Sequence, residues 1–219
     1  MYKRPINVII ADDHTLFRKG LVMVVSTFEN CNVVADFSNG QEALEYLRKE
    51  PVDLILLDLD MPEVNGYDTA RKIIASYPKT HIIIISSNSE LEVIAELIEI
   101  GVHSYLLKDA EPAEVLKAIQ SVINNDFYYN QVVSKALRQN FQKTRVSESQ
   151  TKEANLTKRE IEVLTLICQE MTVKEISEEL ILSEQTILTH RKHLMKKIQA
   201  KNAVSLVRFA IQNQIISFV

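Results

Sequence analysis

The chain has 219 residues, a net charge of −4 and 46% hydrophobic residues, ordinary values for one or two globular domains. The longest apolar run is far shorter than the ~20 residues of a membrane span, and no signal peptide is evident, so we expect a cytoplasmic protein without a membrane partner. Residues 1–150 contain 15 Lys and Arg against 21 Asp and Glu, whereas residues 151–219 contain 10 against 8. An acidic first part and a mildly basic second part indicate two separate tasks.

Residues 1–125 alternate short apolar runs with amphipathic segments. The apolar runs are nearly all Ile, Leu and Val, which is typical of strands with both faces covered by helices. We predict strands at 6–11, 33–37, 54–58, 81–86 and 104–107. Helices are predicted near 14–27, 40–49, 66–77, 89–100 and 112–124. Five successive strand–helix units indicate an α/β domain with a doubly wound, five-stranded parallel sheet.

Past residue 125 the pattern is helical. One helix is predicted at 131–144, and the polar segment 144–155 marks a boundary, so we assign 126–154 to a linker. An all-α second domain then covers 155–219. Its four helices are predicted near 158–170, 173–180, 184–199 and 203–214.

Local signals place the starts of these four helices. Thr157 with Glu160, and Thr172 with Glu175, match the capping box, in which each side chain bonds a free backbone N–H at the helix start. Ser183 and Asn202 are the expected caps of the other two helices. The short gap at 181–183 fits the turn of a helix-turn-helix.

Polar residues follow the predicted strands of the first domain. The first strand ends at Asp12 and Asp13, the third at Asp58 and the fourth at Ser86; Lys108 follows the fifth. In such a sheet these positions meet at one edge, where ligands bind. Three close carboxylates repel unless a cation neutralises them, and Mg²⁺ prefers carboxylate oxygens. An aspartate can also attack phosphorus, with a lysine holding the phosphoryl oxygens.

The first domain contains the strings VIIADDHTLFRKGL, DLILLDLDMPEVNGYD, IIIISS and GVHSYLLKDA. Through these strings it resembles the receiver domain of two-component response regulators of the NarL/FixJ class, which has a flavodoxin-like fold. The resemblance implies that Asp58 accepts a phosphoryl group from a histidine kinase. It implies a Mg²⁺ site formed by Asp12, Asp13, Asp58 and the backbone carbonyl of Asp60. It also implies a switch hydroxyl, a phosphate-binding lysine and a switch aromatic residue at Ser86, Lys108 and Tyr105. The Asp60 and Asn88 side chains are expected to tune the phosphoryl lifetime.

Residues 155–214 resemble the LuxR-type DNA-binding domain, through LTKREIEVLTLI, TVKEISEELILSEQTILTHRKHLMKKI and KNAVSLVRFAI. The implied recognition helix begins near Glu184, and its DNA-facing positions are Leu188, Thr189, Arg191, Lys192 and Lys196. The family often has Lys at position 188; Leu can touch a thymine methyl but cannot donate a hydrogen bond, so the preferred site should differ. The family often has Gly where Glu170 stands. Glu does not favour the left-handed backbone that a glycine adopts at a helix end, so a turn of another kind is expected there. The five histidines are not spaced as a metal site and are expected to have cap or surface roles.

The sequence therefore favours a phosphorylation-dependent transcription regulator that binds paired half-sites in double-stranded DNA as a homodimer and is not a conventional enzyme. The last helix carries an apolar stripe that suits either a dimer contact or closure of the four-helix core: Val204, Val207, Ala210 and Ile211. One alternative is a phosphatase of the haloacid dehalogenase kind, since Asp58 and Asp60 have its spacing. Another is an interaction module that no longer binds DNA.

Overall fold

The computed structural model describes residues 4–125, 127–144, 156–169, 171–200, 203–213 and 215–216. The chain divides into two compact units, Met1–Val133 and Ser134–Val219, each described by itself. Residues 145–155 of the expected boundary segment 144–155 lie outside the described residues, as do Glu170 and Asn202. The domain limits given above remain predictions. Among the described residues no helix is both long and apolar enough to cross a membrane.

The first unit contains a five-stranded parallel sheet in the order β2-β1-β3-β4-β5. Its strands are β1 (Ile6–Ala11), β2 (Cys31–Phe37), β3 (Leu54–Leu57), β4 (His81–Ser86) and β5 (Ser104–Leu107). This order confirms the predicted doubly wound, flavodoxin-like sheet. Strand β2 begins two residues earlier than predicted, because Cys31 pairs with Ile6 at the start of β1.

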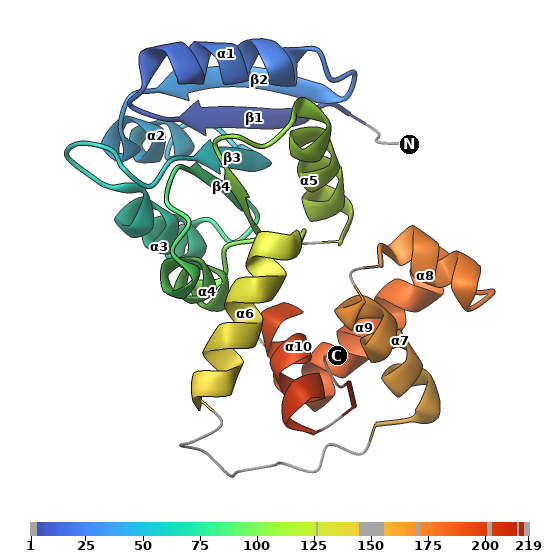
Figure 1. Cartoon of the computed structure of the whole chain (residues 1–219). Helices are drawn as coiled ribbons and strands as arrows, with labels where there is room; N and C mark the ends of the chain where they lie inside the picture. Colours follow the sequence, from blue (N-terminus) through green and yellow to red (C-terminus); the bar gives the residue numbers. More distant parts are fainter. Residues whose placement is uncertain are drawn as a thin grey trace. The chain divides into compact units, whose positions relative to one another are not determined.

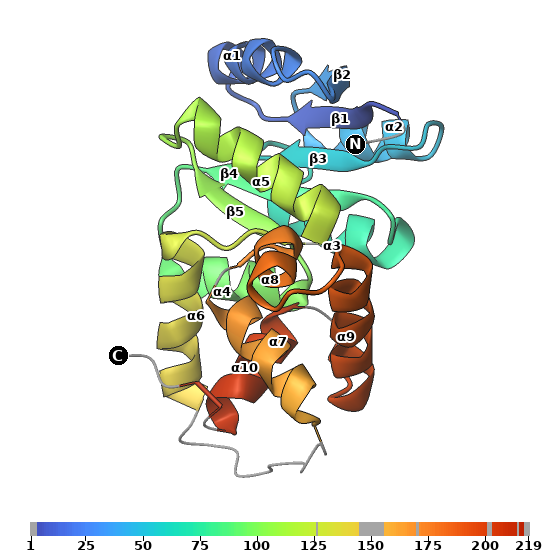
Figure 2. The ribbon, with the colours of Figure 1, turned by 90° about the vertical axis from the view of Figure 1, so that its right-hand side faces the viewer.

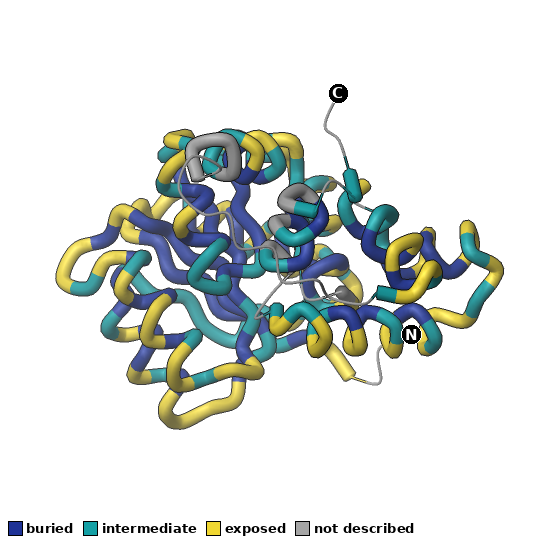
Figure 3. The backbone as a smooth tube through the Cα atoms, turned by 90° about the horizontal axis from the view of Figure 1, so that it is seen from below, coloured by how far each residue is buried: buried dark blue, intermediate teal, exposed yellow. Residues whose placement is uncertain are grey.

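Five helices follow the strands: α1 (Thr15–Ser26), α2 (Gly40–Leu47), α3 (Gly66–Ser76), α4 (Leu91–Ile100) and α5 (Pro112–Asn125). They lie on both faces of the sheet (Figures 1 and 2). On one face, Leu21 and Val25 of α1 and Ile119 of α5 pack against Val8 and Ile10. Strands β1, β3, β4 and β5 are buried along most of their length (Figure 3), which explains why they contain few polar residues, whereas the edge strand β2 is only partly buried and includes Asn32 and Asp36.

Helix α6 (Gln131–Thr144) begins in the first unit and has the predicted bounds. The second unit continues with α7 (Lys158–Cys168), α8 (Val173–Glu179), α9 (Glu184–Lys197) and α10 (Ala203–Gln212). Both capping boxes are confirmed at α7 and α8, and the Ser183 side chain accepts a hydrogen bond from Thr186 N–H. Helix α9 contacts α7 and α8, which is the predicted helix-turn-helix arrangement.

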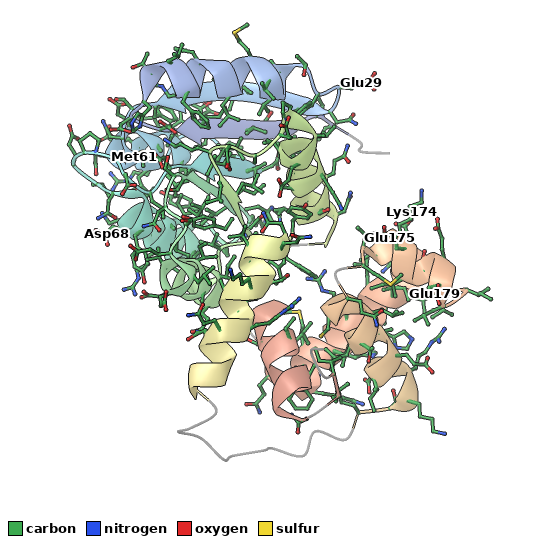
Figure 4. The ribbon with its side chains drawn as sticks, in the orientation of Figure 1. Glu29, Met61, Asp68, Lys174, Glu175 and Glu179 are labelled. Atoms are coloured by element: carbon green, nitrogen blue, oxygen red, sulfur yellow. The ribbon has the colours of Figure 1, made fainter. Side chains whose placement is uncertain are left out.

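The exposed side of α8 is charged: Lys174, Glu175 and Glu179 stand on its outer surface (Figure 4). Its other side contributes Val173 and Ile176 to the core. A helix this short is not stable in isolation, so α8 is stabilised mainly by the packing of its apolar face.

Candidate functional site

Three side chains from three strands meet at the carboxyl edge of the sheet. Asp12 follows β1 and Asp58 follows β3, and each is only 2% exposed. Lys108 follows β5; its Nζ donates to Asp58 Oδ2 at 2.7 Å and lies 2.8 Å from Asp12 Oδ2. The structure thus brings together three of the five residues that the strand ends predicted.

The backbone around Asp58 is fixed on both sides. Asp58 N–H donates to Ala11 O at 2.8 Å, and Leu59 N–H donates to Asp58 Oδ1 at 2.8 Å. Gly66, at the start of α3, lies so close that a Cβ there would be 1.9 Å from Asp58 O and 2.7 Å from Leu59 Cα. Only glycine permits this approach, so the loop after β3 folds back against the strand.

Burial and charge set the protonation of this cluster. Burial raises the pKa of Asp58, and the neighbouring Asp12 carboxylate raises it further, although Lys108 and Leu59 N–H act in the opposite direction. Burial lowers the pKa of Lys108, but the hydrogen bonds with Asp12 and Asp58 outweigh it, and its net pKa is raised. The lysine is therefore a permanent cation beside an acidic cluster that a second cation would stabilise.

Four residues at this edge present metal-binding atoms within 4.8 Å of one another: Asp12, Asp13, His14 and Asp58. The sequence analysis did not include His14 in this group; it expected cap or surface roles for the histidines, and His14 is an exposed residue at the start of α1. It is the N-cap residue of α1, but its side chain makes no cap bond; instead Nδ1 lies 2.7 Å from Asp13 Oδ1. The Asp-Asp-His run was the available signal, because consecutive residues after a strand all lie at its carboxyl end.

Ser86 and Tyr105 lie on neighbouring strands and are both fully buried. Asn88 N–H donates to Ser86 Oγ at 3.1 Å, and Tyr105 Oη donates to Asn88 O at 2.7 Å. Burial raises the pKa of Tyr105 to about 12, and the charges of Asp60 and Asp58 contribute in the same direction. Tyr105 thus stays a neutral donor, and the exposed Asp60 carboxylate lies near enough to influence it.

In the second unit, α9 presents a mixed exposed surface. Thr189, Lys192 and Lys196 are exposed, and Leu188 is 36% exposed although it is a large hydrophobic residue. Ile187 and Leu194 form the buried side of the helix, as expected. Four of the five predicted DNA-facing residues therefore lie on the exposed surface.

Arg191 does not. It was expected on the exposed surface of α9, but it is only 6% exposed and lies among the buried residues of the helix, between Ile187 and Leu194. The prediction of its exposure is wrong because Arg191 is four residues past Ile187 and three before Leu194, which places it on the apolar side. The run of basic residues predicted an exposed charged surface and gave no indication that Arg191 is buried.

Helix α10 contributes to the core of its own unit. Leu206, Val207 and Ala210 are buried, and the helix packs against α7 and α9. The side chains of Val204 and Ile211 lie outside the described residues. The structure supports core closure for the described half of the predicted apolar stripe.

A doubly wound sheet with this acidic edge, joined to a helix-turn-helix unit, defines a two-domain signalling regulator. The family model for the response regulator receiver domain matches residues 8–120, and that for bacterial regulatory proteins of the luxR family matches residues 154–210. The chain belongs to the two-component response regulators of the NarL/FixJ class, with a receiver followed by a LuxR-type DNA-binding domain.

Relatives and solved structures agree over nearly the whole chain. Identity is 30% to the oxygen regulatory protein NreC of Staphylococcus epidermidis, over 96% of this chain and 99% of that one. It is 31% to the response regulator UvrY of Escherichia coli, over 95% and 94%. A structure of RcsB from Salmonella enterica serovar Typhimurium, bound to the promoter rprA with the phosphomimetic BeF3⁻, has a TM-score of 0.57 at 25% identity, over 95% and 99%.

Proposed function

We propose that Asp58 is the phosphoacceptor of this regulator, taking the phosphoryl group from the phosphohistidine of a sensor histidine kinase. The observation that carries the proposal is the Lys108 ammonium, 2.7 Å from Asp58 Oδ2 at the edge of the sheet. Asp58 Oδ attacks phosphorus while the histidine nitrogen leaves, and the product is an acyl phosphate. Positioning and charge neutralisation carry most of the catalysis in such a transfer, and a fixed lysine supplies both.

The donor set fits a Mg²⁺ ion. Asp12, Asp13 and Asp58 offer carboxylate oxygens, and the backbone carbonyl of Asp60 is a further expected ligand. Magnesium, when bound, neutralises charge on the transferring phosphoryl group. In this protein Lys108 contacts both Asp12 and Asp58 and balances one unit of the negative charge, so net negative charge is left for the ion to neutralise.

Ser86 and Tyr105 are proposed to transmit the change. Their shared partner Asn88 precedes α4, so a shift of Ser86 towards the phosphoryl group would alter the hydrogen bond that holds Tyr105. Such a local charge event biases a two-state surface. The expected outcome is homodimerisation and DNA binding.

The exposed surface of α9 is proposed to bind paired half-sites in double-stranded DNA. Lys192 and Lys196 would contact phosphates, while Leu188 and Thr189 would face bases in the major groove. Arg191 is assigned a packing role in place of a base contact because it is buried.

Phosphorylation of Asp58 is tested by incubating the full chain with acetyl phosphate and Mg²⁺ and separating the products on a phosphate-affinity gel. Wild type should form one slower band that disappears on alkaline treatment, as an acyl phosphate does. Asp58→Asn should form none. Asp68→Asn, which changes an exposed acid of α3 (Figure 4), should behave as wild type. Phosphorylation of the Asp58→Asn variant at the wild-type rate would contradict the proposal, and sustained turnover of a phosphate ester would favour the phosphatase alternative.

A further inference from the structure

Arg18, on α1, is a buried arginine with two specific partners. Its Nη1 donates to the backbone carbonyl of Asp12, and its Nε donates to Asp36 Oδ1 at 2.9 Å. The residue is only 9% exposed. A guanidinium is rarely buried unless it is paired, so both contacts matter for its placement.

A register shift in the sheet makes the Asp36 contact possible. Val8 pairs with Val33, but Ile9 pairs with Ala35, so β2 gains one residue against β1. Asp36 consequently pairs with Ile10, whose side chain faces α1 and α5. Without the extra residue Asp36 would pair with Ala11 and point to the opposite face, because side chains alternate along a strand.

The Asp12 carbonyl controls more than its own residue. It shares a planar peptide unit with the nitrogen of Asp13, so a donor that holds the carbonyl also fixes the direction in which Asp13 leaves the strand. The other Asp12 groups are held as well: its N–H donates to Phe37 O at 3.1 Å, and its Oδ1 accepts from His14 N–H at 2.7 Å. Arg18 completes this set of bonds.

We propose that Arg18, oriented by Asp36, is a positioning residue that fixes the Asp12–Asp13 turn for Mg²⁺ binding. The inference rests on the magnesium site of the proposed function. The contacts run from the Asp36 carboxylate on β2 through the Arg18 guanidinium on α1 to the backbone carbonyl of Asp12. Arg18 and Asp36 thus support the proposed metal ligands without being ligands themselves. Partners that orient metal ligands in this way commonly change metal affinity by about 10–100-fold when they are removed.

Lys19 provides a matched control. Its Nζ bonds the same Asp36 carboxylate at 2.9 Å to each oxygen, but its side chain is 58% exposed, and its described bonds go to Asp36 alone. Removing Lys19 thus disturbs Asp36 and the local charge without touching Asp12.

The test is Mg²⁺ affinity of the full chain, measured by calorimetry, for wild type, Arg18→Met, Arg18→Lys and Lys19→Met. Arg18→Met should raise the dissociation constant about 10-fold or more. Arg18→Lys should give an intermediate value, because an ammonium lacks the planar fork that bonds Asp12 and Asp36 together. The dissociation constant of Lys19→Met should stay within about twofold of wild type, because an exposed ion pair contributes little.

Phosphorylation by acetyl phosphate supplies a second readout. At saturating Mg²⁺ the rate of each Arg18 variant should return to within about twofold of wild type, since the reacting groups are unchanged. Wild-type Mg²⁺ affinity in a folded Arg18→Met or Arg18→Lys protein would overturn the inference, and if Arg18→Met does not fold, Arg18→Lys decides it. Absence of Mg²⁺ binding by wild type would instead contradict the proposed magnesium site.

Discussion

Lys108 Nζ lies 2.7 Å from Oδ2 of Asp58, so the ammonium from the end of β5 reaches the proposed phosphoacceptor at the end of β3. The same nitrogen lies 2.8 Å from Asp12 Oδ2. One lysine therefore links both buried carboxylates and balances part of their charge. An incoming phosphoryl group would find this cation already in place.

Replacing Lys108 should impair phosphorylation more than metal binding. Lys108→Met removes the cation but leaves the carboxylates, so the initial rate with acetyl phosphate should fall on the order of 10²-fold. Mg²⁺ affinity should not decrease, since a competing cation has been lost. Rates from phosphate-affinity gels and dissociation constants from calorimetry check both parts. Lys117→Met, which removes a lysine beside the Tyr128 ring, is the control; an equal loss in both variants would contradict the account.

Gly66 and Gly20 should respond in opposite ways to alanine. Gly66→Ala would push a Cβ into Asp58 O and so displace the backbone of the acceptor, lowering both the unfolding temperature and the phosphorylation rate. Gly20→Ala, in α1, meets no atom within 4 Å and should stabilise the protein by about 0.5–1 kcal/mol. Thermal unfolding and the gel assay measure the two effects. A Gly66→Ala protein with normal stability and rate would show that the loop after β3 is not constrained as described.

Leu188 should make DNA binding sensitive to a thymine methyl. Thymine carries the methyl group of the major groove, and an exposed leucine on α9 has no hydrogen bond to offer. Replacing the contacted thymine by deoxyuridine should weaken wild-type binding about fourfold, the value of one buried carbon. Binding titrations with singly substituted duplexes locate the position.

The control for this effect is Leu188→Ala, which should bind thymine and deoxyuridine duplexes alike. Lys192→Ala, in contrast, should keep the methyl effect but weaken binding to all sequences and reduce its salt dependence. Tight binding by wild type without sensitivity to any thymine methyl would exclude Leu188 as a base contact while leaving DNA binding intact.

Glu160 should make the second unit sensitive to acid. It is 3% exposed, caps α7 and accepts from Lys197 Nζ at 2.7 Å. Burial raises its pKa, but the bonds from Lys197 and Thr157 outweigh burial and hold the pKa below 4.5. Its stabilisation is thus fully present above the unfolded value of 4.5 and is lost as the pH falls through the lower folded value.

Glu160→Gln should consequently destabilise α7 at pH 7 by about 2 kcal/mol, and the difference from wild type should shrink below pH 4.5. Hydrogen exchange of the α7 amides, compared between the proteins at each pH, measures it. Glu162→Gln breaks only an exposed pair with Arg159 and should change little. A pH-independent difference would mean that the Glu160 charge does not stabilise the fold.

The apolar runs predicted the strands closely because both sheet faces are covered, and strand ends placed Asp12, Asp58 and Lys108 together. The extra residue of β2 could not be predicted from the sequence, because apolar residues continue through it. The contact between Asp36 and Arg18, which depends on that residue, could therefore not be predicted either. The charge run of α9 predicted a basic surface but hid the buried position of Arg191. Periodicity predicts elements well, whereas register and helix facing depend on packing partners distant in sequence.

Phosphorylation of Asp58 is proposed to control DNA binding by α9. The most direct test is in vitro selection from a random DNA pool, with and without Mg²⁺ and beryllofluoride, a phosphoryl mimic expected at Asp58. The account predicts a paired half-site motif that is enriched by the activated wild type, and enriched much less by the untreated protein or by treated Asp58→Asn. Equal enrichment in all three samples, or none in any, would contradict it.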